Sequence, residues 1–399
     1  MKILITDIHH GNGGGHVTYI LNLLEGLKAS CDLTLASPPT GRLYARAKSI
    51  KGIRVLPGLY TSRPLTLAAE VLKLRRFLSR ERFDVVHVNG GADHRHVMLA
   101  RIGMRRPPAI VWTKHNTNPV DSVGHRLRAR FGTDSAIAVC EYVQRQLSRS
   151  AYGNRPIHVV RNGIDPRYVG FSTAEQRRAS RAALFADLPE DAFVFGSVGG
   201  TDYNKGWLLL LQAVARLPIE EQRRIRIVIA GDPPSAQMLA DAQASGLDLG
   251  QVVFPGLVPD IRNVLAACDV GFVLSYREAA SYASCETMAA GLPTLVSAAG
   301  GLPENVRDGV DGWVVPVGDV EALTRCVSNI LKTSPETLAS LGASAKHRIE
   351  TVFSIPTFLA HTEQVYRAAC KRYDRVQSDG APLRSSRVTS TSASRRTPL

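Results

Sequence analysis

The sequence predicts an α/β protein made of two doubly wound halves, each built on a parallel sheet. Short apolar runs rich in β-branched residues alternate with helical stretches, which is typical of parallel βαβ units. This rhythm restarts near residue 193 with a second set of runs. The 399 residues suffice for two ordinary cores, and a composition of 44% hydrophobic and 21% charged residues is that of a globular protein.

In the first half, apolar runs predict the strands in chain order. The first run, 2–8, is followed by a glycine-rich turn and by residues 17–28, which are apolar at helical spacing. The other strand runs of this half are 32–37, 53–57, 84–89, 109–115, 135–140 and 157–163.

The second half repeats this pattern and sets the domain organisation. Its strand runs are 193–200, 226–232, 251–256, 270–275, 294–299 and 312–316, with a helix expected over 205–217. We expect an N-terminal domain over 1–168, a C-terminal domain over 169–355, a crossover helix over 356–375 and a disordered tail over 376–399. Residues 166–192, polar and loosely patterned, form the expected connection.

The charge of the chain is unevenly distributed. Residues 1–170 hold 26 Lys and Arg against 11 Asp and Glu, whereas residues 171–370 hold 16 against 22. A basic half indicates an anionic partner. The alternative is that its charge only keeps the protein in solution. The six scattered cysteines and the lack of a signal-peptide pattern favour a reduced, cytoplasmic location.

Three loops after predicted strands carry candidate functional residues, because ligands of doubly wound sheets bind at the carboxyl ends of the strands. Gly14 and Gly15 open the first helix, where a phosphate can approach the backbone, although a tight turn would also explain them. Lys205 stands at a helix start and suits an oxyanion such as a diphosphate, unless it is a solvated lysine. His115 ends an apolar strand and enters a polar loop, where a functional side chain would stand.

A metal site is not predicted. His94 and His96 lie two residues apart, but no cysteine or carboxylate cluster completes four ligands. We therefore expect neither a metal ion nor a cofactor.

Two carboxylates, Glu278 and Glu286, frame a stretch of small residues. Glu278 follows a strand, whereas Glu286 lies in a helix that ends near Gly291. If the helix began at Glu278, the two carboxylates would lie about 12 Å apart along its axis, which is wider than the roughly 5–9.5 Å between paired glycosidase carboxylates. This spacing argues against a hydrolytic acid/base pair. The small residues leave helix-start amides uncovered for an anion, with a carboxylate on each side to bind hydroxyl groups. A nucleotide-diphosphate sugar has this chemistry.

Residues 278–286, EAASYASCE, resemble the E-x7-E motif of the retaining glycosyltransferases of family 4, which have the GT-B fold of two facing Rossmann-like domains. The likeness continues through residues 288–319, and weaker matches precede it at 13–27, 83–89, 111–115, 159–165, 202–214 and 228–232. It therefore extends over nearly the whole chain to about residue 375 and is most specific in the second half.

The resemblance implies roles for the residues of the motif. Glu286 would bind the ribose hydroxyls, and Glu278 would contact the donor hexose as a catalytic-site residue. Ala280, Ser281 and Tyr282 would offer backbone amides to the donor.

It also implies roles for residues outside the motif. Lys205 would neutralise the donor diphosphate, assisted by Gly14 and Gly15 from the facing domain. His115 would act at the anomeric carbon, and Val258 would contact the base. Such enzymes retain the anomeric configuration, and the departing phosphate helps to take the acceptor proton, so that no separate protein base is needed. Neutralisation of the donor phosphate by the lysine and the helix amides would replace the metal ion that other transferases use.

The chain departs from the family pattern at two positions. An aromatic residue is usual at the position of Ala280, and here Tyr282 stands two residues further on. An arginine is frequent at the position of Gly199, and Arg161 is a candidate to replace its charge. The identity of the donor sugar therefore cannot be copied from the family.

The function expected from this resemblance is transfer of a hexose-type sugar, with a UDP-sugar favoured as donor, to a glycan or lipid-linked acceptor. The basic residues 65–82 predict an amphipathic helix, either an ordinary solvated one or one that lies on an anionic membrane surface. We favour a peripheral enzyme at the inner face of the cytoplasmic membrane, acting in the synthesis of lipopolysaccharide or another envelope polysaccharide.

Three other function classes are compatible with parts of the sequence. A sugar-nucleotide 2-epimerase-like isomerase uses the same fold, and an inactive nucleotide-sugar-binding module would explain the missing arginine. The positive charge alone suggests a nucleic-acid-binding protein, but the chain shows no RNA-binding or helix-turn-helix signature, so we expect no nucleic-acid partner.

Overall fold

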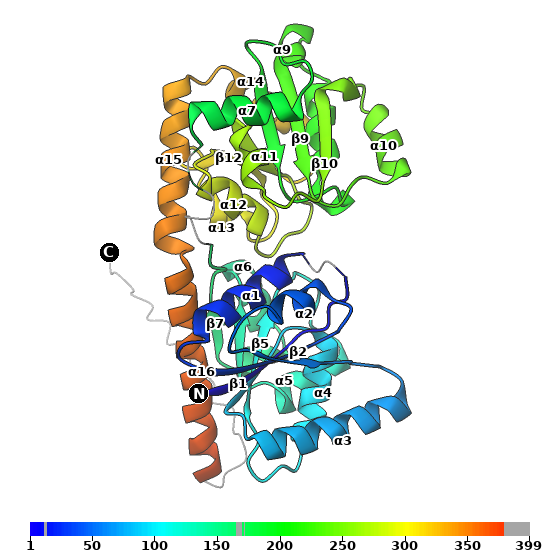
Figure 1. Cartoon of the computed structure of the whole chain (residues 1–399), viewed down its shortest axis with the longest axis vertical. Helices are drawn as coiled ribbons and strands as arrows, with labels where there is room; N and C mark the ends of the chain where they lie inside the picture. The colour runs from blue at the N-terminus through cyan, green and yellow to red at the C-terminus, as the bar shows by residue number, and fades with distance from the viewer. Residues whose placement is uncertain (12–13, 165–169, 171, 379–399) are drawn as a thin grey trace, which may run out of the picture.

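The chain folds into two α/β lobes, as Figure 1 shows for the computed structural model, which describes residues 1–11, 14–164, 170 and 172–378. Most of the predicted disordered tail, from residue 379 onward, lies outside the described residues. The predicted fold class, two doubly wound parallel sheets, is confirmed. The domain boundaries stay a prediction.

The first lobe contains a seven-stranded sheet in the order β3-β2-β1-β4-β5-β6-β7, and every strand pairs in parallel with its neighbours. Helices cover both faces, which is why runs such as Val85–Val88 are buried along their whole length. The strands are β1 Lys2–Thr6, β2 Asp32–Ser37, β3 Arg54–Pro57, β4 Val85–Val88, β5 Ala109–Lys114, β6 Ser135–Ala138 and β7 Ile157–Val159. The helices are α1 Gly14–Leu27, α2 Arg42–Ala47, α3 Pro64–Glu81, α4 Gly91–Arg101, α5 Val123–Phe131, α6 Glu141–Ser148 and the 3-10 turn η1 Ala151–Asn154.

The second lobe contains a six-stranded parallel sheet in the order β10-β9-β8-β11-β12-β13. Its strands are β8 Phe193–Ser197, β9 Ile225–Ala230, β10 Val252–Gly256, β11 Val270–Val273, β12 Thr294–Ser297 and β13 Gly312–Val315. Its helices are α7 Ala174–Leu184, α8 Trp207–Val214, α9 Ile219–Arg224, α10 Ala236–Gln243, α11 Arg262–Ala266, α12 Tyr282–Ala289, α13 Leu302–Asn305, α14 Val320–Leu331 and α15 Pro335–Val352, with 3-10 turns η3 Tyr203–Lys205 and η4 Leu249–Gln251.

The expected connection, 166–192, contains a helix that its weak apolar pattern did not indicate. Helix α7 begins with a capping box, in which Thr173 and Gln176 exchange hydrogen bonds between side chain and backbone. Arg181 binds the carboxylate of Asp269 at 2.6 Å, and Arg177 binds the same group. These ion pairs, together with the partly buried Leu184, hold this helix on the second lobe.

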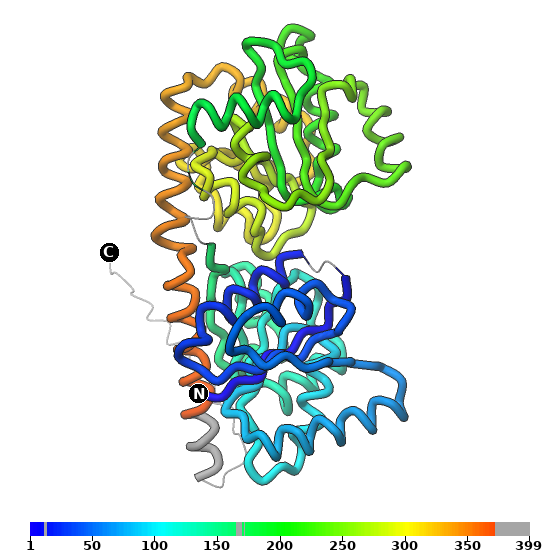
Figure 2. The backbone as a smooth tube through the Cα atoms, in the orientation of Figure 1, coloured from blue at the N-terminus to red at the C-terminus, as the bar shows by residue number. Residues whose placement is uncertain are grey.

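The last helix, α16 Ile355–Ser378, returns the chain to the first lobe. With α15 it runs along one side of both lobes (Figures 1 and 2). Its Tyr366 is fully buried, and the Tyr366 hydroxyl lies 2.7 Å from Nδ1 of His87 on β4. The predicted crossover helix is therefore part of the core of the first lobe.

Strand order reverses direction at the same place in both sheets. The chain moves outward from β1 to β3 and then crosses to β4, and it moves from β8 to β10 and then crosses to β11. Loops after β1 and β4, and after β8 and β11, therefore diverge and leave room for ligands at the carboxyl edge. The carboxyl edges of the two sheets face each other, because residues after β6 contact residues after β12.

Candidate active site

At the switch point of the second sheet, two predicted residues form an ion pair. Lys205, at the end of η3 after β8, places its Nζ 2.8 Å from Oε2 of Glu278, in the loop after β11. The Lys205 side chain is 29% exposed and that of Glu278 14% exposed. The pair is thus partly buried, yet a ligand can still reach it.

Asn204 holds the two loops of this pair together. Its side-chain amide donates to the carbonyl of Arg277 at 2.8 Å and accepts the Arg277 N–H at 3.1 Å, while its carbonyl accepts the Tyr276 N–H at 2.8 Å. Sequence analysis missed this residue. The sequence feature that could have identified Asn204 is its position directly before Lys205, in a loop that follows a strand.

Helix α12 begins within the predicted motif. Ser281 is its N-cap, and the Ser281 hydroxyl accepts the N–H of Ser284 at 3.2 Å. Ala280 is partly buried at the end of the preceding loop. Glu286 lies in the second turn, and burial raises the pKa of its carboxyl to about 7. The loop and helix positions predicted for Glu278 and Glu286 are both observed.

Two glycines allow a neighbouring loop to support this motif. Gly300 has φ of +54°, and a Cβ there would lie 1.8 Å from the carbonyl oxygen of Glu278. A Cβ on Gly301 would lie 2.0 Å from the carbonyl oxygen of Ala279, and the Gly301 N–H donates to Glu278 at 3.1 Å. The glycine pair after β12 thus fixes the backbone that carries Glu278.

The first lobe meets this motif through its glycine turn. A Cβ on Gly15 would lie only 3.1 Å from Cδ2 of Tyr282, so the start of α1 contacts the start of α12. Gly14, beside it, has φ of +49°, a conformation that other residues rarely adopt. The structure therefore brings Gly14 and Gly15 next to the predicted donor-binding residues.

His115 lies at the carboxyl edge of the first sheet and is held by Asn89, which follows β4. The Asn89 amide nitrogen donates to the carbonyl of Thr6 at 3.0 Å, so its oxygen accepts from His115 Nε2 at 2.9 Å. The proton is then on Nε2, and Nδ1 is the acceptor. Burial, together with the nearby rings of His16 and His87, lowers the pKa of His115 well below its usual range. His115 is a neutral imidazole, and Asn89 is a second residue that sequence analysis missed.

The remaining predicted positions lie around this centre. A Cβ on Gly199 would lie 3.9 Å from Cδ of Lys205, so an arginine there would stand beside the lysine. Arg161, the candidate replacement, instead pairs with Glu141 at 2.9 Å and lies 3.8 Å from Glu304. Val258, in the loop after β10, is partly buried against a small cluster of apolar residues.

His94 and His96 have separate partners. Nε2 of His94 contacts the carbonyl of Gly132 at 2.8 Å, whereas Nε2 of His96 contacts Glu70 at 2.9 Å. Neither belongs to the histidine and carboxylate cluster that is found among the described residues, which consists of Asp7, His9 and His16.

That cluster follows β1 and was not predicted. Nδ1 of His9 lies 2.7 Å from Oδ1 of Asp7, and this hydrogen bond raises the pKa of His9. Burial acts to raise the pKa of Asp7, but His9 overcomes it and the pKa is lowered. Burial lowers the pKa of His16 to about 4.

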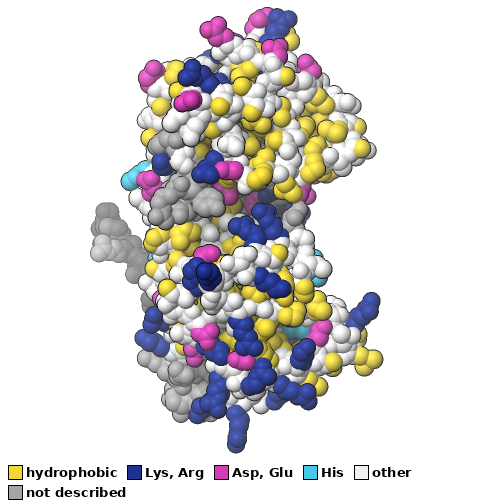
Figure 3. Space-filling view, in the orientation of Figure 1, with side chains coloured by type: hydrophobic (Ala, Val, Ile, Leu, Met, Phe, Trp, Pro, Cys, Tyr) yellow, Lys and Arg dark blue, Asp and Glu magenta, His cyan; other side chains and the backbone are white. Residues whose placement is uncertain are grey.

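The predicted basic helix is α3. It presents Lys73, Arg76 and Arg80 to solvent, and the apolar Leu65 and Leu72 are 90% and 53% exposed. Lys and Arg side chains are also more numerous over the first lobe, in the lower half of the view in Figure 3. Within the described part of the chain, no helix has the length and apolarity needed to cross a membrane.

Comparison with known proteins identifies both lobes. Residues 13–168 match the family described as "Glycosyltransferase Family 4", and residues 181–348 match "Glycosyl transferases group 1". A D-inositol 3-phosphate glycosyltransferase of Mycobacterium avium is 34% identical over 48% of this chain and 45% of its own length. An MMP alpha-(1->4)-mannosyltransferase of Mycolicibacterium hassiacum is 32% identical over 57% of this chain and 52% of its own length. The chain thus spans about half the length of the curated relatives it matches.

Solved structures resemble the whole described fold. Anabaena Alr3699/HepE in complex with UDP superposes with a TM-score of 0.79 at 19% identity, covering 92% of this chain and all of that one. WaaG, a glycosyltransferase involved in lipopolysaccharide biosynthesis, superposes with a TM-score of 0.69 at 16% identity, covering 91% and 99% of the two chains. These likenesses establish the GT-B fold. Residues 13–168 are therefore a glycosyltransferase family 4 domain, and residues 181–348 are a glycosyl transferases group 1 domain.

Proposed function

We propose that the chain is a retaining glycosyltransferase that moves a hexose-type sugar from a nucleotide-diphosphate sugar to a glycan or lipid-linked acceptor. The observation that carries this proposal is the meeting of Lys205, Glu278 and the start of α12 at the carboxyl edge of the second sheet, opposite Gly15. A cation, free helix amides and a carboxylate in one place suit a diphosphate sugar, whose leaving group gains negative charge during transfer.

In this proposal the second lobe holds the donor. The ammonium of Lys205 exchanges part of its bond with Glu278 for the diphosphate, and the ionised Glu286 accepts hydrogen bonds from ribose hydroxyls. Glu278 contacts the hexose, the backbone of Ala280, Ser281 and Tyr282 faces the donor, and Val258 lies toward the base.

His115 contributes to the reaction from the first lobe. Its unprotonated Nδ1 accepts a hydrogen bond from a hydroxyl of the transferred sugar, which orients the anomeric carbon. Because His115 is neutral and oriented by Asn89, it positions the sugar rather than donating a proton. The departing phosphate takes the acceptor proton on the same face, so the configuration is retained.

A UDP-sugar is the donor we favour, and an envelope glycan such as lipopolysaccharide is the product. The likeness to the UDP complex of Anabaena HepE and to WaaG supports this choice. The exposed basic and apolar residues of α3 suit a peripheral position at the inner face of the cytoplasmic membrane, where a lipid-linked acceptor would be collected.

The test is a thermal-shift screen of the full chain against UDP-, GDP- and ADP-sugars, because a bound ligand raises the melting temperature. We expect one nucleotide class to stabilise the protein and to be hydrolysed slowly without acceptor, with the anomeric configuration of the released sugar retained in NMR spectra. Binding without hydrolysis or transfer would indicate an inactive module. An altered, unreleased sugar would indicate an isomerase.

A further inference from the structure

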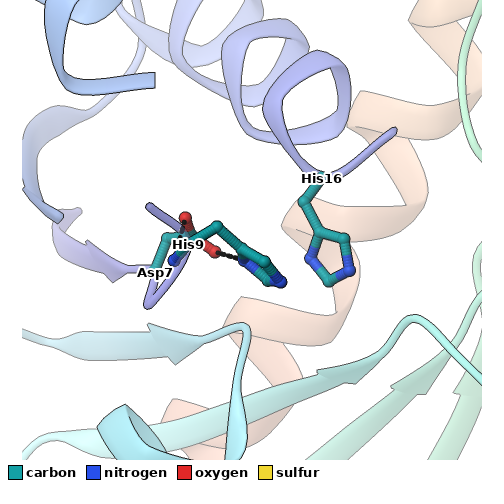
Figure 4. Close-up of side chains that lie close together, drawn as sticks. All are labelled: Asp7, His9 and His16. Atoms are coloured by element: carbon teal, nitrogen blue, oxygen red, sulfur yellow. Dashed lines mark hydrogen bonds and ion pairs between the residues drawn. The ribbon is translucent and has the colours of Figure 1, made fainter. Parts of the chain in front are cut away.

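The loop after β1 and the start of α1 bring three potential metal ligands together. Asp7 and His9 follow β1, and His16 lies in the first turn of α1. One oxygen or nitrogen atom from each side chain can be chosen so that all three lie within 4.8 Å of one another. Figure 4 shows the His9 ring between Asp7 and the ring of His16.

The existing contacts satisfy only part of this cluster. His9 is bound to Asp7 twice, through Nδ1 at 2.7 Å and through its backbone N–H at 3.1 Å. The His9 and His16 rings lie 4.0 Å apart between centroids. Nδ1 of His16 is buried and has no hydrogen-bond partner among the residues that the structure describes. A buried nitrogen without a partner is costly, so a further group is expected beside it.

We propose that Asp7, His9 and His16 bind a divalent transition-metal ion of the zinc type. A carboxylate and two imidazoles form a common donor set for Zn²⁺, which binds such ligands at about 2.0–2.2 Å. Ligand atoms of a tetrahedral site then lie roughly 3.3–3.5 Å apart, as follows from those bond lengths. The chosen atoms now lie within 4.8 Å of one another, so side-chain rotations that shift them by up to about 1.5 Å would bring them to this geometry.

Each side chain is constrained in a way that suits this site. Asp7 is fully buried, whereas His9 is one-third exposed, so the ion can enter from the side of His9. His9 would coordinate through Nδ1, the nitrogen that faces Asp7, so the ion replaces the present hydrogen bond between the two side chains and its proton is released on binding. Three protein ligands leave one tetrahedral position for water or for an oxygen atom of a bound molecule.

The site lies beside the proposed catalytic centre but does not depend on it. The ring of His16 is 4.4 Å from that of His115, whereas the donor diphosphate is assigned to Lys205 and α12. Metal binding here therefore goes beyond the proposed function, and it holds or fails whichever substrate the enzyme uses.

The test measures metal binding by the full chain after removal of metals with EDTA. Titration calorimetry with Zn²⁺ should show one equivalent bound, and Co²⁺ should give the visible absorption of a tetrahedral site. D7N, H9A and H16A should each weaken Zn²⁺ binding by about tenfold or more. H10A is the matched control, because His10 is exposed, contacts Thr40 and lies outside the cluster.

Equal Zn²⁺ affinity in wild type, H9A and H16A, or no stoichiometric binding by the wild type, would overturn the proposal. Circular dichroism of each variant excludes unfolding as the cause of weaker binding, and H16Q provides a second variant with a side chain of similar size if H16A does not fold. If the wild-type protein binds Zn²⁺ but binds no nucleotide sugar, that result counts against the proposed function and leaves the metal site standing.

Discussion

The carboxyl edges of the two sheets carry their functional side chains in different ways. On the second sheet, Glu278 and Glu286 lie in one continuous segment, and Lys205 is joined to it by a single ion pair. On the first sheet, the corresponding side chains come from separate strand ends. They are Asp7 and His9 after β1, His16 on α1, Asn89 after β4 and His115 after β5.

This difference separates two kinds of chemistry. The second lobe offers a cation, a carboxylate and helix amides, which together suit an anion with hydroxyl groups beside it. The first lobe offers neutral or paired imidazoles, which orient hydroxyl groups or bind a metal ion. We therefore expect substitutions of Lys205 or Glu286 in the second lobe to weaken donor binding, and substitutions of the catalytic-site imidazole in the first lobe to slow the reaction with little change in donor affinity.

The largest expected effect is that of Lys205→Ala. Removing the cation leaves the diphosphate uncompensated and Glu278 without its ion-pair partner, so donor affinity should fall by about 100-fold. Titration calorimetry with the nucleotide sugar chosen by the thermal-shift screen measures this change. Lys332→Ala is the control, because Lys332 is a largely exposed lysine of the same lobe, at the C-cap of α14. Unchanged affinity in Lys205→Ala would remove the second lobe from donor binding.

His115→Ala tests the other side of the comparison. Donor affinity should change less than threefold, whereas hydrolysis and transfer rates should fall by roughly 10- to 100-fold, because the sugar is bound but not oriented. Asn89→Ala should give a smaller loss of the same kind, since His115 would keep its ring contacts with His16 and Tyr19 but lose the group that sets its tautomer. If donor affinity falls as much as the rate, the proposed division between the lobes is wrong.

The sequence predicted the two sheets and the motif of the second lobe better than it predicted residues that join separate loops. The strands of both sheets were predicted, because buried parallel strands are continuous apolar runs. Glu278, Glu286 and Lys205 were found as candidates since a loop next to a helix start is readable along the chain. Asn204 and Asn89 were missed, because an asparagine that joins two loops is recognised only when its partners are known.

The cluster after β1 was missed for a related reason. His9 and His16 are seven residues apart, which is no metal-ligand spacing, and a turn of the chain brings them together. His94 and His96 lie only two residues apart, but they form hydrogen bonds with different partners, Gly132 and Glu70. Spacing along the chain therefore gave no signal for the cluster at this sheet edge.

The pH dependence of donor binding tests the role of Glu286. Its pKa is raised to about 7, so the carboxyl is mostly neutral at pH 6 and mostly ionised at pH 8. Ribose hydroxyls donate to the ionised form, so donor affinity should rise by about tenfold from pH 6 to pH 8 and then level off. Calorimetry in buffers of different ionisation enthalpy should show about one proton released below pH 7.

Glu286→Gln is the control for this measurement. Glutamine keeps an acceptor oxygen without a titrating group, so the affinity should be lower at pH 8 but nearly constant from pH 6 to pH 8. An unaltered pH profile in this variant would assign the dependence to another group and place Glu286 outside the ribose site.

The smallest expected effect concerns Glu304, which ties the two lobes together. Its carboxylate accepts the backbone N–H groups of Glu141 and Tyr142, each at 2.7 Å, so a residue of the second lobe caps helix α6 of the first. Glu304→Gln keeps one acceptor but loses the charge that favours a helix N-terminus, so the melting temperature should fall by only a few degrees. Glu350→Gln on α15 is the matched control, because it removes one exposed carboxylate of the same lobe. If Glu304→Gln also slows transfer without changing donor affinity, the contact aligns the two edges during the reaction. The contact between Glu304 and the start of α6 then sets the position of His115 in the first lobe relative to the donor site in the second lobe.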